Sequence, residues 1–204
     1  MRKIRCFLKL IRYQNLLLLA ITQLFVKNYI LDFSKYINSS ESSISFYLLA
    51  IITSLITAGG YIINDVFDVE SDKINKNKKL IVGRYISTGT AIFWYYLLNT
   101  LSIIIAIYLV YLIQNYFLII IFPATIYILW KYSKKYQHSF ILGNVIVSFL
   151  TSLSILNVLL FSNNFNLSIK KIGLNCLNST NFILVMVYSG FVFFIILLRE
   201  IIKD

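Results

Sequence analysis

Six long apolar segments account for most of this 204-residue chain and limit what it can fold into. They lie at 13–33, 44–65, 88–112, 116–130, 140–162 and 182–198. All but the fourth have about 17–25 residues, the length that an α-helix needs to cross about 30 Å of hydrocarbon. The segments are continuous rather than alternating, which excludes a membrane β-barrel. We therefore expect an all-α bundle of about six transmembrane helices, with one membrane domain over residues 1–204.

The basic residues predict the orientation of this bundle, because cytoplasmic loops of membrane proteins are enriched in lysine and arginine. With both termini in the cytoplasm, fifteen of the nineteen basic residues lie on the cytoplasmic side, and only Lys27, Lys35, Lys170 and Lys171 lie on the other. This bias accounts for the net charge of +11 without a nucleic-acid partner. We expect an integral protein of a bacterial inner (cytoplasmic) membrane whose active site faces the cytoplasm.

Four of the eight acidic residues fall within one stretch of eight, where the second apolar segment reaches the predicted cytoplasmic surface. Asp65, Asp68 and Asp72 are spaced i, i+3 and i+7 and so share one helical face, and Asn64 joins its edge. Glu70 points to the opposite side. Three carboxylates on one face repel one another unless a cation lies among them, and oxygen ligands of this kind suit Mg²⁺. The sequence therefore predicts a helix that continues through these residues and turns its carboxylates into a pocket at the cytoplasmic end of the bundle.

The acidic stretch Asn-Asp-x-x-Asp-x-x-x-Asp at 64–72 resembles the first aspartate-rich motif of the UbiA superfamily of intramembrane prenyltransferases. Other segments resemble that superfamily too: Arg12-x-x-Asn15, Ile81 to Ser87, Tyr132-Ser133-Lys134-Lys135, Gly143-Asn144 and Arg199 to Asp204. Tyr13 and Lys79-Leu80 depart from it, because the superfamily usually has a proline and an Arg-Pro pair at these places. Within the superfamily, the chain is most similar to the geranylgeranylglycerol-phosphate geranylgeranyltransferase group.

The last residues resemble the start of the second aspartate-rich motif, and the chain stops at the first aspartate of that motif. Members of the superfamily normally continue through three more spans. The resemblance therefore implies that the chain is the N-terminal two-thirds of a nine-span fold, truncated at the C-terminus; whether the gene itself is truncated or frameshifted stays open. We expect the 204-residue chain by itself to be inactive or very weakly active.

The resemblance implies Mg²⁺-dependent transfer of a prenyl group from an allylic diphosphate to an acceptor. It makes Asp65, Asp68 and Asp72 the catalytic metal ligands, joined by Asn64 and Asp204. The residues implied to bind the diphosphate are Arg12, Asn15, Asn64, Lys79, Arg84, Lys134 and Lys135. Fixed cations aimed at a developing negative charge are usually the largest catalytic contribution, which gives these side chains a physical role.

The acceptor and the function class stay open at this point. The acceptor is a lipid such as geranylgeranylglycerol phosphate, or alternatively 4-hydroxybenzoate or a naphthoate quinone precursor. A hypothesis of another class is an inactive membrane fragment that keeps the motifs without catalysis. A third is a small cation transporter, which predicts ionisable residues near mid-membrane. Here the acids lie at the membrane edge, so the enzyme hypothesis is preferred.

Overall fold

A computed structural model describes residues 2–30, 40–74, 81–137, 139–161 and 180–203 of the chain. In chain order the elements are α1 (Arg2–Leu10), α2 (Tyr13–Phe25), the π-helical turn η1 (Val26–Ile30), α3 (Ser40–Phe67), α4 (Val69–Ile74), α5 (Thr88–Ile113), the 3-10 turn η3 (Tyr116–Ile120), α6 (Ile121–Lys131), the π-helical turn η4 (Tyr132–Tyr136), α7 (Phe140–Leu160) and α9 (Thr180–Lys203). Within these ranges the only extended pairing is an isolated bridge between Val82 and Ile86. The predicted all-α class is confirmed.

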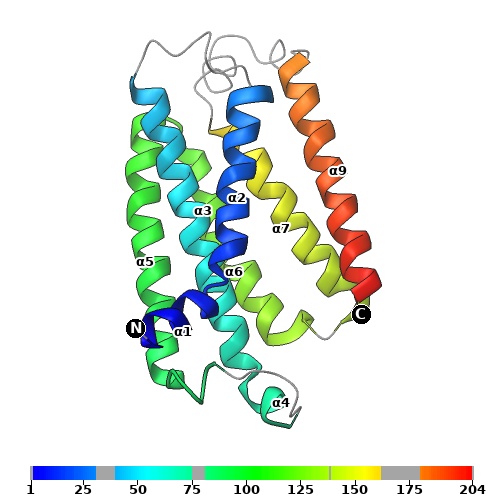
Figure 1. Cartoon of the computed structure of the whole chain (residues 1–204). Helices are drawn as coiled ribbons and strands as arrows, with labels where there is room; N and C mark the ends of the chain where they lie inside the picture. Colours follow the sequence, from blue (N-terminus) through cyan, green and yellow to red (C-terminus); the bar gives the residue numbers. More distant parts are fainter. Residues whose placement is uncertain (1, 31–39, 75–80, 138, 162–179, 204) are drawn as a thin grey trace.

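Among the described residues, five helical segments are long and apolar enough to cross a membrane, and they overlap the last five predicted spans. They are Ile44–Phe67, Thr88–Ile113, Tyr116–Tyr136, Ile141–Leu160 and Phe182–Ile202. Figure 1 shows that the long helices stand side by side and that both termini lie toward the end of the bundle that carries α1 and α4, here called the lower end. The predicted orientation likewise needs both termini at one end of the bundle.

The predicted first span at 13–33 is helical from Tyr13 to Ile30 but is not among these five. It is less apolar because it carries polar side chains that the protein itself buries: Gln23 is 0% and Lys27 is 5% exposed. The Gln23 side-chain nitrogen donates to the carbonyl of Ser154 at 3.0 Å, and its oxygen accepts from the Thr53 hydroxyl at 3.2 Å. Polar contacts to α3 and α7 thus help to hold α2 in the bundle.

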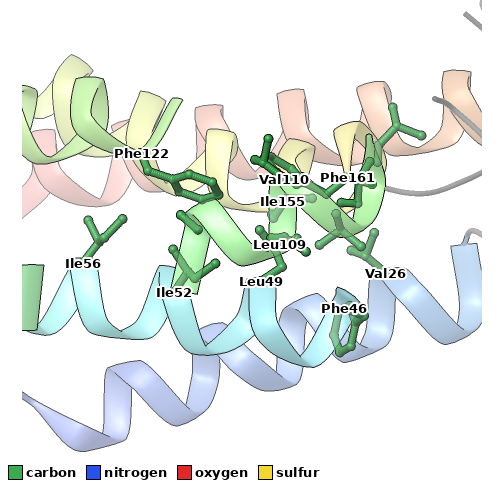
Figure 2. Packing of buried hydrophobic residues seen from close by; sticks show 14 of the residues in the cluster. Val26, Phe46, Leu49, Ile52, Ile56, Leu109, Val110, Phe122, Ile155 and Phe161 are labelled. Atoms are coloured by element: carbon green, nitrogen blue, oxygen red, sulfur yellow. The ribbon is translucent and has the colours of Figure 1, made fainter. Parts of the chain in front are cut away.

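One apolar core joins α3, α5, α6, α7 and α9 (Figure 2). Leu49 and Ile52 of α3 are fully buried there against Leu109 of α5, Phe122 of α6 and Ile155 of α7. Burying an aliphatic or aromatic side chain of this size contributes about 1.5–3 kcal/mol to stability, relative to leaving it exposed to water. The core lies in the middle and upper parts of the bundle and leaves the lower end of α3 to a second cluster.

Close approach of α3 to two neighbours depends on a pair of glycines. A Cβ on Gly59 would lie 2.9 Å from the side-chain nitrogen of Asn99 on α5, and a Cβ on Gly60 would lie 3.1 Å from Leu129 on α6. Small residues let helix backbones approach in this way inside a membrane. The pair therefore fixes the lower half of α3 against α5 and α6.

The second cluster fastens α1 across the lower end of the bundle (Figure 1). Leu10 is fully buried in it beside Ile62 of α3, and the ring of Phe7 packs at a tilt of 48° against that of Trp94 on α5, with centroids 4.8 Å apart. The chain then turns at Arg12 into α2. This anchoring brings the start of α2 next to the end of α3.

Candidate active site

The helix that carries the acidic motif is interrupted within it. α3 ends at Phe67, Asp68 lies in a turn, and α4 begins at Val69. The Asp68 amide still donates to the carbonyl of Asn64 at 3.0 Å, so helical bonding lasts to that residue. Val69 is then buried in the lower cluster together with Val82, which turns the chain away from the axis of α3. The prediction of a helix that continues through the motif is therefore wrong, because tertiary burial of Val69 overrides the helical spacing.

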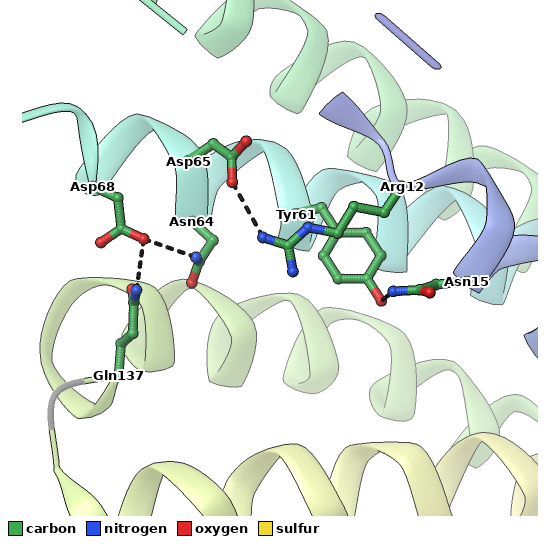
Figure 3. A network of polar contacts seen from close by, with 7 residues as sticks. All are labelled: Arg12, Asn15, Tyr61, Asn64, Asp65, Asp68 and Gln137. Carbon is green, nitrogen blue, oxygen red and sulfur yellow. Dashed lines mark hydrogen bonds and ion pairs between the residues drawn. The ribbon is translucent and has the colours of Figure 1, made fainter. Parts of the chain in front are cut away.

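Asp68 contacts the connection between α6 and α7. Its Oδ2 atom accepts from the side-chain nitrogen of Gln137 at 2.6 Å and from that of Asn64 at 3.1 Å (Figure 3). The carboxylate is only 8% exposed. Two amide donors therefore replace water around this buried negative charge, as charge-assisted hydrogen bonds can.

Asp65 contacts the start of α2 instead. It accepts from Nη2 of Arg12 at 3.3 Å, and the Arg12 guanidinium lies 4.6 Å from the centroid of the Tyr61 ring (Figure 3). Asn15 donates to the Tyr61 hydroxyl at 3.1 Å. The pattern at 12–15 and the acidic motif, about fifty residues apart in the sequence, thus meet in one polar network.

The backbone at Arg12 is left-handed, with φ 50° and ψ 53°. A residue with a long side chain in this region costs about 1–3 kcal/mol. The ion pair to Asp65, the stacking on Tyr61 and the burial of Leu10 hold the corner in place. Arg12 is therefore positioned by the corner itself, before any ligand arrives.

The other predicted cations that the structure describes lie over aromatic rings. Arg84 lies over the ring of Tyr85 at 5.4 Å, Lys134 over Trp130 at 4.9 Å and Lys135 over Tyr136 at 5.7 Å. All three cations are exposed, and each lies over an aromatic ring close to it in sequence. Such contacts are worth about 0.5–1 kcal/mol at exposed sites, so they do not fix these long side chains at one place. Lys79, Asp204 and the side chain of Asp72 lie outside the residues that the structure describes.

The sequence matches the UbiA prenyltransferase family over residues 36–204. The chain belongs to this family. The matched range includes the acidic motif and the connection between α6 and α7, whereas Arg12 and Asn15 precede it and join the site by the contacts above.

Several curated relatives of this UbiA-family chain are digeranylgeranylglyceryl phosphate synthases. The synthase of Sulfurisphaera tokodaii is 34% identical over 155 residues, which cover 74% of this chain and 50% of the relative. That of Saccharolobus solfataricus is 35% identical over 161 residues, or 76% and 49% of the two chains. The chain thus spans about half the length of the curated relatives it matches. No solved structure matches it significantly.

Two residues of the UbiA-family site were missed by sequence reasoning. Tyr61 precedes Asp65 by one helical turn, and this i, i+4 spacing was a usable signal. Gln137 lies two positions after the Tyr-Ser-Lys-Lys segment, but nothing local shows that it reaches Asp68. Its position depends on Gly143, where a Cβ would lie 2.6 Å from the carbonyl oxygen of Tyr136. The missing side chain at Gly143 lets the connection fold closely over the start of α7.

The donor atoms around Asp68 fit the Mg²⁺ that the family implies. The side-chain oxygens of Asn64 and Gln137 are buried and have no hydrogen-bond partner among the described residues. With the Asp68 carboxylate they form a set of oxygen atoms only, the kind that hard divalent cations bind. In the described part of the chain no cluster of three or more His, Cys, Asp or Glu side chains occurs, and Asp65 pairs with Arg12.

Proposed function

We propose that this chain takes part in the Mg²⁺-dependent transfer of a prenyl group from an allylic prenyl diphosphate to a phosphate-bearing prenyl-glycerol lipid. One observation carries the proposal: two carboxylates at the lower end of α3 are each joined to a different neighbouring element, Asp65 to Arg12 and Asp68 to Gln137. The names of the curated relatives support a glyceryl phosphate acceptor over an aromatic one. The fifteen basic residues predicted on one side support a site that faces the cytoplasm, in the cytoplasmic membrane.

The chemistry needs a strongly anionic leaving group to be neutralised as its carbon–oxygen bond breaks. Mg²⁺, when bound, supplies Lewis-acid stabilisation of the diphosphate. Oxygens of Asp68, Asn64 and Gln137 are the described atoms of this chain that would hold the ion, joined by Asp65 where the ion displaces Arg12. The Arg12 guanidinium offers a second, permanent positive charge at the same place. The side chains of Arg84, Lys134 and Lys135 are exposed. They are long enough to turn from the aromatic rings that they contact toward a bound polyanion.

The cation-transporter hypothesis has less support. The described acids of the motif lie where α3 ends, rather than in the middle of a span, where conduction sites are expected. Along the five apolar segments the described interior is lined by uncharged polar groups such as Asn99, Ser102 and Ser148.

Donor binding tests the proposal directly. The purified chain in lipid nanodiscs is titrated with geranylgeranyl thiodiphosphate, a slowly reacting donor analogue, with Mg²⁺ or with EDTA. We expect binding that requires Mg²⁺ and is weakened about tenfold or more by Asp68→Ala, since a lost charge-assisted contact is worth about 1.5–3 kcal/mol. Glu70 is exposed on α4, and Glu70→Ala is the matched control that leaves affinity unchanged. Equal weakening by the two substitutions would contradict the proposed site.

Transfer itself is measured in membranes with the gene's reading frame, including any sequence downstream of codon 204. Radiolabelled geranylgeranyl diphosphate and geranylgeranylglycerol phosphate are the substrates. A labelled lipid with two prenyl chains is the expected product. Parallel assays offer 4-hydroxybenzoate or a naphthoate as the acceptor. Label transferred only to these compounds would show that the acceptor is aromatic and not a lipid.

A further inference from the structure

An apolar groove runs along the flank of α3, between α1, α2 and α5, and encloses about 390 Å³. On α3 its lining extends from Phe46 to Ala58, which corresponds to about 18 Å along the helix axis. Ala20 of α2 and Ala50 and Ala58 of α3 leave the space that larger side chains would fill. The groove is long, narrow and open at the side, as a site for an extended hydrocarbon chain would be.

The lining of the groove is almost entirely hydrocarbon. Among the lining residues only Ser54 carries an aliphatic hydroxyl group. That hydroxyl already donates to the carbonyl of Ala50 at 2.7 Å. The groove therefore offers little hydrogen bonding to a polar ligand along its length. An apolar chain is the ligand for which such a surface is suited.

The groove leads to the candidate active site along one face of α3. Residues of that face follow one another at spacings of three and four: Tyr47, Ile51, Ser54 and Ala58 in the groove, then Tyr61 and Asp65 below it. At the lower end, Arg12 covers the ring of Tyr61 and pairs with Asp65. A chain in the groove thus has a permanent cation at one end.

α1 adds positive charge and a membrane-facing surface at this same end. Phe7 and the adjoining Ile11 line the groove, whereas Arg5 and Lys9 are exposed on the opposite side of α1. Exposed apolar residues of α1 adjoin these cations, Ile4 among them at 67% exposed. Figure 1 shows α1 lying across the lower end of the bundle, where the headgroup layer would be. A short helix with apolar and basic faces in this position is typical of membrane-surface segments.

We propose that the groove binds the hydrocarbon chain of a phosphate-headed membrane lipid, with the phosphate at Arg12 and beside the basic face of α1. The inference deepens the proposed function and rests on it for the lipid's role: the acceptor is a lipid of this class. The groove delivers that acceptor from the bilayer along α3 and leaves its phosphate end at the mouth that contains Asp65. A neutral lipid or a helix of another protein would not use the cations at the lower end.

The groove is tested by photo-crosslinking of the full chain in nanodiscs of phosphatidylcholine. The probe is a trace of phosphatidic acid with a diazirine in its acyl chain, and labelled peptides are mapped by mass spectrometry. We expect labelling concentrated on α2 and α3, and more of it than with a diacylglycerol probe of the same chain. Excess unlabelled geranylgeranylglycerol phosphate should compete for it.

Bulky substitutions give the matched comparison. Ala20→Phe fills the groove and should reduce labelling by about tenfold or more, the effect of losing roughly one decade of affinity. Ala124→Phe adds the same bulk at an exposed position of α6 and should leave labelling unchanged. Ser54→Phe repeats the block from the α3 side, and size-exclusion profiles establish that each variant is folded. If Ala20→Phe or Ser54→Phe fails to fold, the other of these two variants is compared with Ala124→Phe.

Several outcomes overturn the inference. Labelling spread evenly over the exposed faces of α5 and α9 would mean ordinary bilayer lipid. Equal labelling by the phosphatidic acid and diacylglycerol probes would remove the headgroup role of Arg12, and undiminished labelling of a folded Ala20→Phe would remove the groove itself. Because the assay needs neither Mg²⁺ nor a donor, its failure leaves the donor-binding result unaffected, and failure of donor binding leaves the lipid labelling unaffected.

Discussion

Replacing Gln137 with methionine removes one of the two hydrogen-bond donors to Asp68 and keeps the length of the side chain. The bond is short, at 2.6 Å, and its acceptor is a carboxylate that is 8% exposed. After the substitution only the Asn64 side-chain nitrogen, at 3.1 Å, remains as a hydrogen-bond donor to this oxygen atom within the described chain. The substitution therefore tests whether this contact holds the connection between α6 and α7 against α3.

The expected size follows from the charge on the acceptor. A hydrogen bond to a charged group contributes about 1.5–3 kcal/mol to stability, and one between neutral groups about 0.5–1.5 kcal/mol. Gln137→Met should thus lower the free energy of unfolding by about 1.5–3 kcal/mol in the native background and by about half of that when Asp68→Asn is already present. The difference is a coupling energy of about 1 kcal/mol or more, which a double-mutant cycle isolates.

Unfolding is measured by titration with SDS in mixed micelles, followed by tryptophan fluorescence. Gln14→Met serves as the control, because Gln14 is exposed on α2 and its loss should change little. A coupling energy below about 0.5 kcal/mol, within the usual additivity of independent sites, would refute the stabilising contact between Gln137 and Asp68.

Two further substitutions test the backbone and the cation of the site. Gly143→Ala places a Cβ 2.6 Å from a carbonyl oxygen of η4. It should lower the free energy of unfolding by about 1–3 kcal/mol, which corresponds to several degrees in the unfolding temperature. Gly190→Ala meets nothing within 4 Å and should be neutral or stabilising. Equal unfolding temperatures for these two variants would argue against the close approach. Arg12→Lys keeps the charge but loses the planar group that lies on the ring of Tyr61, so affinity for the thiodiphosphate should fall by about tenfold, while Arg5→Lys should leave it unchanged. An Arg12→Lys variant with native affinity would show that charge alone matters there.

Hydropathy was sufficient to predict the bundle, because a helix in lipid must be both long and apolar and few other folds satisfy its backbone. The first span was harder to predict. Gln23 and Lys27 lower its hydropathy, but both are buried by neighbouring helices, and a sequence does not show which polar residues have such partners. Length and composition therefore locate five segments clearly and the sixth only through its contacts.

The site was predictable where its signal is local. The spacing from Asn64 to Asp68 lies within one helical turn, and both residues are in the network. The end of α3 at Phe67 depends on the burial of Val69 beside Val82, which comes from a separate segment. The bond from Gln137 to Asp68 joins residues 69 positions apart, and no periodicity extends that far. Tertiary contacts decided these features, so the helical spacing alone predicted a continuous helix where α3 ends.

The corner at Arg12 belongs to two structures at once. Its strained backbone joins the surface helix α1 to α2, and its side chain neutralises part of the charge on Asp65. Any cation that competes with Arg12 for Asp65 also weakens a contact that keeps this corner closed. Cation binding at Asp65 and the geometry of the corner between α1 and α2 are therefore expected to be coupled, because both depend on the same ion pair.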